Sequence, residues 1–140
     1  MIIITLAEYF AGKPHEKSHE QAAQILLDRV MGLLNYLVQT KGLKLSKCPN
    51  TGTYISGSKG GSGDGGFRLP TATTGTKLSS HKEATGLDAY DPENCIDDAI
   101  TEDPSLLIMF DLYREDPKET KHWCHLTIRV PGSKKRTFLI

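Results

Sequence analysis

The sequence lacks an excess of charge of either sign, a paired set of cysteines and any long hydrophobic run. Its 17 basic and 17 acidic residues cancel, so the charge balance predicts binding neither to nucleic acid nor to an anionic membrane. The three cysteines, Cys48, Cys95 and Cys124, are odd in number and scattered, which argues against a disulfide framework and suits a reducing compartment. No apolar run is long enough to predict a membrane span.

The length of 140 residues predicts a single domain over residues 1–140, with enough chain to bury a core. The first residues, MIIITLAEYFAG, are apolar only briefly, have no basic segment and include Glu8. We therefore expect no secretory signal and synthesis in the cytoplasm. We also expect a monomer.

Residues 18–40 carry the clearest helical pattern. Ser18 and Gln21 have the spacing of a capping box, and Gly42 is a plausible terminator. Apolar residues recur at steps of three and four along this segment. They are Ala23, Leu26, Leu27, Val30, Leu33, Leu34 and Leu37.

Strand signals are concentrated near the C-terminus. Residues 122–130, HWCHLTIRV, alternate between two faces. One face carries Cys124, Leu126, Ile128 and Val130, and the other carries Trp123, His125, Thr127 and Arg129. Residues 43–58 resemble short strand material, residues 67–103 are loop-rich, and residues 105–113 form a short helix or strand. We predict an α+β fold in which a small antiparallel sheet packs on the long helix and leaves His125 on the open face.

Two short motifs are coincidental matches to known signatures. His15 and His19 lie in HEKSH, which has the form H-E-x-x-H of zinc proteases. Pro14 and Ser18 place this stretch before or at a helix start, and no third ligand follows at the usual spacing, so we expect a solvated first turn. The glycine-rich stretch GSGDGG contains G-x-G-x-x-G, but FRLP follows it, and a dinucleotide site needs a helix there. We expect a surface loop.

A third group of residues is a stronger metal candidate. His81 and Asp88 lie seven residues apart in loop-rich sequence, and His125 lies on the polar face of the predicted strand. Two imidazoles and one carboxylate can hold zinc and leave a fourth position for water, as a hydrolase requires. Spacing alone leaves open the alternative that His81 and Asp88 are ordinary surface groups.

Taken together, S-x-H-x-x-x-x-G-x-D and a later W-x-H resemble zinc peptidases that cut peptidoglycan stem peptides. These include D-alanyl-D-alanine carboxypeptidases, D-Ala-D-Ala dipeptidases and phage L-alanyl-D-glutamate endopeptidases. The resemblance is closest to small phage and prophage members. It spans ITLAEYF, GGFRLPTATTGTKLSSHKEATGLDAYDPEN and LYREDPKETKHWCHLTIRVPGSKKRTFLI, in the family's order. It implies that His81, Asp88 and His125 bind Zn²⁺.

The resemblance also implies roles for residues around the metal. Arg68, in GGFR, matches an arginine that holds the substrate carbonyl and stabilises developing negative charge. Ser80 and Gly86 match flanking positions with turn or hydrogen-bonding roles, and Trp123 matches a tryptophan that either walls the pocket or packs. We take Ser80 and Trp123 as candidate substrate-binding residues. Arg68 has the alternative of an ordinary surface arginine.

The sequence departs from the family at two points: G-G-F-R replaces the commoner S-G-Y-R at Arg68, and the position of the general base is changed. Many members carry an acidic residue three positions before the last histidine, where this chain has His122. Glu115 is our preferred base, because its EDP element recurs in the most similar members, and Asp116, Glu119 and His122 remain alternatives. The alternation of Cys124 with Leu126 and Ile128 predicts a buried side chain rather than a metal ligand.

The resemblance implies a zinc metallopeptidase with a fold like that of the D-Ala-D-Ala peptidases and Hedgehog domains. Its partners would be peptidoglycan stem peptides, cut as a carboxypeptidase or an endopeptidase. A phage lysis or virion protein fits best, acting on the cell wall after release, and a role in muropeptide recycling is an alternative. Two non-enzymatic alternatives are a zinc-holding binding module and a structural virion component with the same fold.

Overall fold

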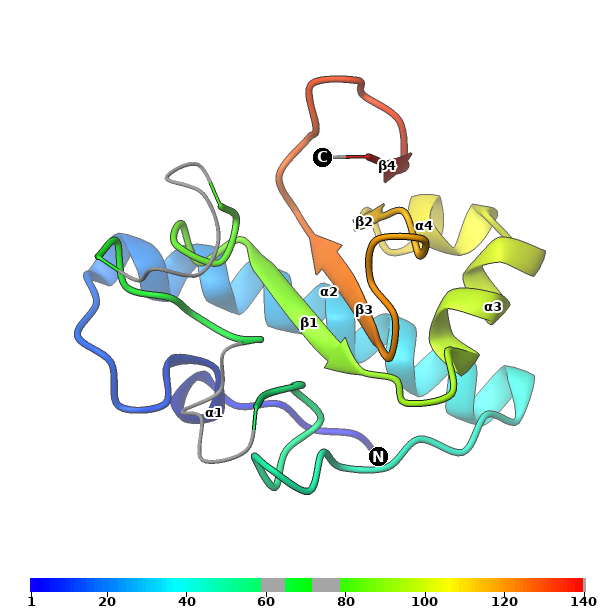
Figure 1. The fold of residues 1–140 in the computed structure, drawn as a ribbon, viewed down its shortest axis with the longest axis horizontal. Coiled ribbons are helices and arrows are strands. Elements are labelled where there is room, and N and C mark those ends of the chain that lie inside the picture. The colour runs from blue at the N-terminus through cyan, green and yellow to red at the C-terminus, as the bar shows by residue number, and fades with distance from the viewer. Residues whose placement is uncertain (59–64, 72–78, 140) are drawn as a thin grey trace.

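The computed structural model describes residues 1–58, 65–71 and 79–139, and it has an α+β fold. A long helix covers one face of a four-stranded sheet (Figure 1). The elements in chain order are α1 (Leu6–Phe10), α2 (Lys17–Lys41), β1 (Gly86–Tyr90), α3 (Cys95–Glu102), α4 (Ser105–Met109), β2 (Tyr113–Glu115), β3 (Trp123–Thr127) and β4 (Thr137–Phe138). The predicted α+β class is confirmed. None of the helices in the described part of the chain has the length and apolar character to cross a membrane.

Helix α2 supplies more buried residues to the core than any other helix or strand. Its buried residues are Ala23, Leu26, Leu27, Val30, Leu33, Leu34 and Leu37, the set that the sequence pattern predicts. The helix begins at Lys17, so Ser18 lies within its first turn. The prediction that Ser18 caps the helix is therefore wrong. The backbone N–H of Glu16 instead donates to Nδ1 of His19, which satisfies a donor at the helix start. Gly42 ends the helix in the left-handed conformation, as expected.

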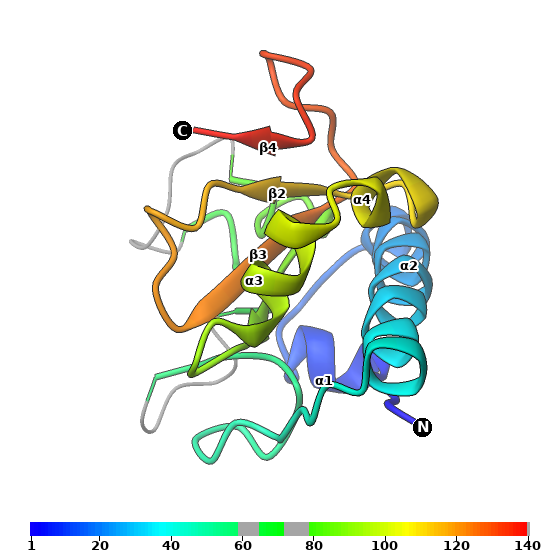
Figure 2. The same cartoon turned by 90° about the vertical axis from the view of Figure 1, so that its right-hand side faces the viewer.

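The sheet has the order β1-β3-β2-β4. Figure 2 shows β2 lying between β3 and β4. Strand β3 runs antiparallel to both β1 and β2, whereas β4 runs parallel to β2, so the sheet is mixed rather than wholly antiparallel. Within β3, Cys124 and Leu126 are fully buried in the core. Trp123, His125 and Thr127 lie on the opposite, open face, as the alternation predicts.

The strand β3 is shorter than the alternating pattern suggests. It ends at Thr127, whose Oγ1 accepts the backbone N–H of Arg129. This local bond competes with continued strand pairing. Val130 is therefore 57% exposed, and the prediction that it shares the buried face is wrong.

Residues 43–58 form little regular structure, contrary to the strand prediction. A single antiparallel bridge pairs Ile55 with Ala89. The hydroxyl of Thr51 donates to the carbonyl of Ile55 and accepts the N–H of Thr53, and Gly52 has a positive φ of 67°. These side-chain bonds hold a turn in place of a strand ladder. Conversely, the region predicted as loop-rich contains both β1 and α3.

A buried ion pair ties β2 to its neighbours. Arg114 donates to Oδ1 of Asp97 at 3.0 Å, to Oγ1 of Thr101 and to Oγ1 of Thr137. The side chains of Arg114 and Asp97 are 6% and 2% exposed. These bonds link β2 to α3 and β4, and they hold the next residue, Glu115, at the edge of the site described below.

Candidate metal centre

The pairing of β1 with β3 brings two predicted ligands together. Asp88 on β1 is the direct cross-strand partner of His125 on β3. Side chains of directly opposed residues leave a sheet on the same face, only about 5 Å apart at their Cβ atoms. Nδ1 of His125 consequently lies 2.7 Å from Oδ1 of Asp88. Asp88 therefore lies on a strand, not in the loop that the sequence suggests.

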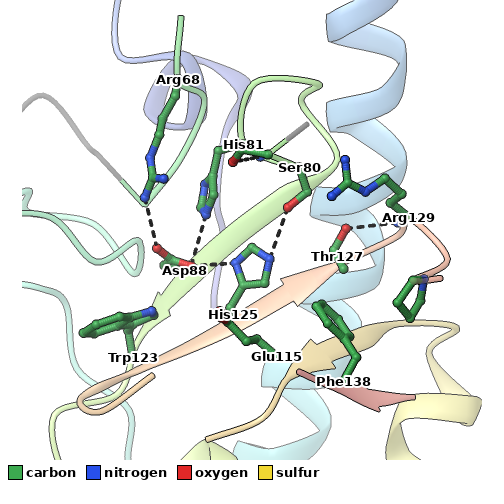
Figure 3. Close-up of a pocket in the computed structure, with 12 residues that line it drawn as sticks. Arg68, Ser80, His81, Asp88, Glu115, Trp123, His125, Thr127, Arg129 and Phe138 are labelled. Atoms are coloured by element: carbon green, nitrogen blue, oxygen red, sulfur yellow. Dashed lines mark hydrogen bonds and ion pairs between the residues drawn. The ribbon is translucent and has the colours of Figure 1, made fainter. Parts of the chain in front are cut away.

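The third predicted ligand, His81, comes from the turn that precedes β1. The carbonyl of Ser80 accepts the N–H groups of Thr85 and Gly86, which closes the turn. The carbonyl of His81 accepts the N–H of Arg68. These bonds direct Nε2 of His81 to 3.3 Å from Oδ1 of the same aspartate (Figure 3).

His81, Asp88 and His125, here called the metal triad, are all buried, and each offers one ligand atom. The three atoms lie within 4.8 Å of one another. Among the residues for which the structure gives positions, this is the one group of three histidine, cysteine or carboxylate side chains arranged to hold a metal ion.

Each imidazole has a hydrogen bond on the side away from the triad. Nδ1 of His81 lies 2.8 Å from the carbonyl of Gly66, which can only accept, so this nitrogen carries a proton. Nε2 of His125 lies 3.1 Å from Oγ of Ser80. Such outer contacts fix the ring orientation and leave the inner nitrogen as a metal ligand. The structure places Ser80 on the ligand histidine, while its substrate-binding role stays a prediction.

Gly86 is required by this packing. A Cβ on Gly86 would lie 2.0 Å from Oγ and 2.7 Å from Cβ of Ser80, and 3.1 Å from Cε1 of His125. Only a residue without a side chain permits the Ser80 hydroxyl to reach the imidazole at this point. The contact between Ser80 and His125 thus explains why the S-x-H-x-x-x-x-G-x-D motif has glycine at this position.

The charge of Asp88 is stabilised by its neighbours. Burial acts to raise the pKa of Asp88. The electrostatic interaction with His81 and the hydrogen bond with His125 have a larger, opposite effect, and they hold the pKa well below its usual range. Oδ2 of Asp88 also lies 3.7 Å from Nη2 of Arg68. The group therefore offers one anionic oxygen and two imidazole nitrogens, the donor types of three-ligand zinc sites.

The metal triad lies in a cavity of about 260 Å³. Arg68 and Trp123 line one side, and Arg129 and Phe138 line the other (Figure 3). Glu115, at the end of β2, also lines the cavity. The structure thus gathers Arg68, Ser80, Glu115 and Trp123 around the triad, whereas their chemical roles stay predictions.

Glu115 is the candidate base that the structure places in the cavity. The pKa of Glu115 is raised, mainly by burial. The charge of His125 acts to lower this pKa, whereas the charges of Asp88 and Glu119 raise it further. His122 lies just before β3 with a positive φ of 78°, and its Nδ1 donates to the carbonyl of Pro92.

His122, Asp116 and Glu119 are not among the described residues that line the cavity. Asp116 instead accepts the N–H of Lys118 and donates its own N–H to the carbonyl of Phe138. Of the four candidates, Glu115 is thus the one that lines the described cavity, while its role as the base stays a prediction.

The histidines of HEKSH have local structural roles. Nδ1 of His15 lies 2.8 Å from the carbonyl of Lys13, its Nε2 lies 2.9 Å from Glu20, and its ring stacks on Phe10. His19 accepts the N–H of Glu16 at the start of α2. Neither histidine belongs to the metal triad, which agrees with the prediction of a coincidental match.

The structure also bears on the G-x-G-x-x-G match and on Cys124. In the G-x-G-x-x-G match, Gly61 and Gly63 lie outside the described residues, while Gly66 leads into irregular backbone at residues 67–69 and supplies the carbonyl that orients His81. Cys124 is fully buried in the core, as predicted, and burial raises the pKa of its thiol well above the usual value.

Comparisons with protein-family models, curated proteins and solved structures found no match to this chain. The metal-binding capacity of the triad therefore stands on its geometry alone.

Arg129 and Phe138 are two cavity residues to which the sequence analysis gives no role. The alternation of residues 122–130 places Arg129 on the face of His125, so a signal for Arg129 was present. For Phe138 no such signal exists, because β4 reaches the site only through its pairing with β2.

Proposed function

We propose that this protein is a zinc peptidase that hydrolyses peptide bonds in peptidoglycan stem peptides. The observation that carries the proposal is the buried metal triad at a cavity that Arg68 and Glu115 also line. A purely structural zinc site closes all four positions with protein ligands, whereas three ligands beside a cavity suit catalysis. The family resemblance of the sequence supports the choice of substrate.

The metal triad would hold the ion, and bound zinc would lower the pKa of water and polarise the scissile carbonyl. Arg68 contributes a preorganised cation on the same side of the cavity as Oδ2 of Asp88. Its guanidinium donates hydrogen bonds to the substrate carbonyl oxygen as negative charge develops there. Because its side chain is only 17% exposed, this interaction is weakly screened by water.

Glu115 transfers the proton. It accepts a proton from the attacking water and delivers it to the leaving amine, as a general base and then a general acid. Its half-buried position in the cavity supports this role, since partial burial favours the protonated state that must form during the reaction. The Arg114 contacts to α3 and β4 keep β2, and hence Glu115, in place.

The biological setting follows from the resemblance to small phage and prophage enzymes. In this proposal the protein acts on the cell wall during phage lysis or from within a virion, and its partners are stem peptides. Trp123 provides an apolar wall of the cavity against which a substrate side chain packs.

The test is incubation of the zinc-loaded protein with purified peptidoglycan, followed by mass spectrometry of the released products. Free D-alanine identifies a carboxypeptidase, and new termini between L-alanine and D-glutamate identify an endopeptidase. The matched controls are the Glu115→Gln variant and protein treated with a chelator. Stoichiometric zinc without any product would overturn the peptidase proposal and favour a zinc-holding module or structural virion component.

A further inference from the structure

We infer that Arg129 determines specificity by binding a carboxylate of the substrate close to the scissile bond. The inference rests on the proposed peptidase function and assigns a role to the second arginine of the cavity. This role is separate from that of Arg68, which faces the metal-binding carboxylate.

Arg129 lies on the opposite side of the metal triad from Arg68 (Figure 3). Its backbone N–H donates to Oγ1 of Thr127, and its Nη1 donates to Oε2 of Glu83 at 3.0 Å. Glu83 belongs to the same turn as His81. Arg129 is therefore held between the end of β3 and the turn that supplies a metal ligand.

The charges of the cavity favour an anionic substrate. The two arginines that line it are balanced by two carboxylates, Asp88 and Glu115. Glu83, the ion-pair partner of Arg129, adds a third carboxylate, so entry of a divalent cation between neutral histidines would leave the site with a net positive charge of about one. A positive, partly enclosed cavity attracts and orients anions.

The ion pair of Arg129 with Glu83 does not prevent this role. Both side chains are exposed, at 41% and 43%. Exposed ion pairs contribute little net stability, so a substrate carboxylate can share or displace Glu83. A guanidinium has five N–H donors in a planar fork, which matches the two oxygens of a carboxylate.

Chain geometry limits how far the carboxylate can lie from the scissile bond. Arg129 is four residues beyond His125, a span of at most about 13 Å in extended backbone. Because Arg129 also lines the cavity of about 260 Å³ that holds the metal triad, the recognised carboxylate lies within about three substrate residues of the cleaved bond. A stem peptide offers two such groups: the C-terminal carboxylate of its last D-alanine, and the free carboxylate of its D-glutamate.

The test uses two pairs of synthetic stem peptides. One pair ends in D-Ala-D-Ala with a free or an amidated terminus, and the other contains D-glutamate with its carboxylate free or amidated. We expect wild-type protein to prefer the free member of one pair by about 10- to 100-fold in kcat/KM, the scale of a charged hydrogen bond. The preferred pair identifies which carboxylate is bound.

Arg129→Gln should reduce this preference to near one, mainly through KM, and Arg129→Lys should restore part of it. The matched control is Arg29→Gln, since Arg29 forms a comparable exposed ion pair with Asp111 on a part of the chain outside the cavity lining. Arg29→Gln should keep the preference. Calorimetric binding of the same peptides to metal-free protein gives a second readout, in which the free member should bind more tightly.

Equal cleavage of both members of each pair by wild-type protein would overturn the role of Arg129 while leaving the peptidase proposal intact. An unchanged preference in Arg129→Gln would do the same. Absence of hydrolysis of all four peptides and of whole peptidoglycan would overturn the peptidase proposal and, with it, this inference.

Discussion

Replacement of Gly86 by alanine should weaken metal binding, although Gly86 itself offers no ligand. The added methyl group would lie 2.0 Å from Oγ and 2.7 Å from Cβ of Ser80. Rotation of the hydroxyl relieves only the first contact, so the backbone of the turn must also shift. Because the Ser80 carbonyl accepts two N–H groups of that turn, the shift extends to the neighbouring ligand, His81.

The size of the effect follows from one lost hydrogen bond and one new steric clash. When Ser80 is displaced, Nε2 of the buried His125 loses its hydrogen bond to Oγ, and loss of such an outer contact lowers metal affinity by about 10- to 100-fold. Overpacking at a buried position also costs about 1–3 kcal/mol of folding free energy. We therefore expect Gly86→Ala to show both weaker zinc binding and a lower melting temperature.

A double-mutant cycle separates this clash from a general effect of the substitution. Ser80→Gly removes both clashing atoms, so Gly86→Ala should cost little more in that background. The remaining contact of the new methyl group, 3.1 Å from Cε1 of His125, needs only a small adjustment. Zinc affinity is measured by competition with a chromophoric chelator, and stability by thermal unfolding in the presence of chelator.

Wild-type zinc affinity and stability in Gly86→Ala would refute this reasoning. So would a double variant whose losses equal the sum of the two single losses, because the two side chains would then be energetically independent. Ser80→Ala provides the intermediate case, since it removes the hydrogen bond to His125 and leaves the turn unstrained.

Three further predictions concern the triad, the base and the buried ion pair. Single alanine variants of the metal triad should lose stoichiometric zinc, whereas the double variant His15→Ala/His19→Ala should keep it. Metal analysis after dialysis measures the zinc content, and full zinc occupancy in a triad variant would contradict the site. Glu115→Gln should lower turnover by roughly 10²-fold or more with zinc retained, the scale for loss of a general base, and His122→Ala should cost much less; the reverse order in steady-state assays would make the imidazole the base. Arg114→Met should lower the free energy of unfolding by about 3–5 kcal/mol, since it leaves the buried carboxylate of Asp97 unpaired. A loss below about 1 kcal/mol in urea titration would show that this carboxylate is neutralised in another way.

Local patterns in the sequence were sufficient for the elements whose burial follows a simple period. The buried face of α2 agrees residue by residue with steps of three and four, because one face of a helix meets the core. The open face of β3 likewise follows from alternation. The limits of both elements were less accurate: Ser18 is inside α2, and Val130 lies beyond β3.

The candidate ligands could be chosen from residue types, spacing and family resemblance, but their mutual geometry could not. Asp88 and His125 meet because the register of β1 on β3 makes them direct partners. A shift of that register by one residue would point one of them into the core. Nothing in the local sequence around Asp88 predicted that it lies on a strand at all.

Sequence alone thus determined which side chains can bind a metal, which helix forms the back of the fold and which face of the last long strand stays open. Only the tertiary structure decided that Glu115 reaches the cavity while His122 turns toward Pro92, that a Gly66 carbonyl orients His81, and that Arg129 and Phe138 complete the wall. The physical reason is the range of the interactions. Periodic burial is encoded in neighbouring residues, whereas strand register, turn closure and outer hydrogen bonds join residues far apart in the chain and depend on the packing of the whole molecule.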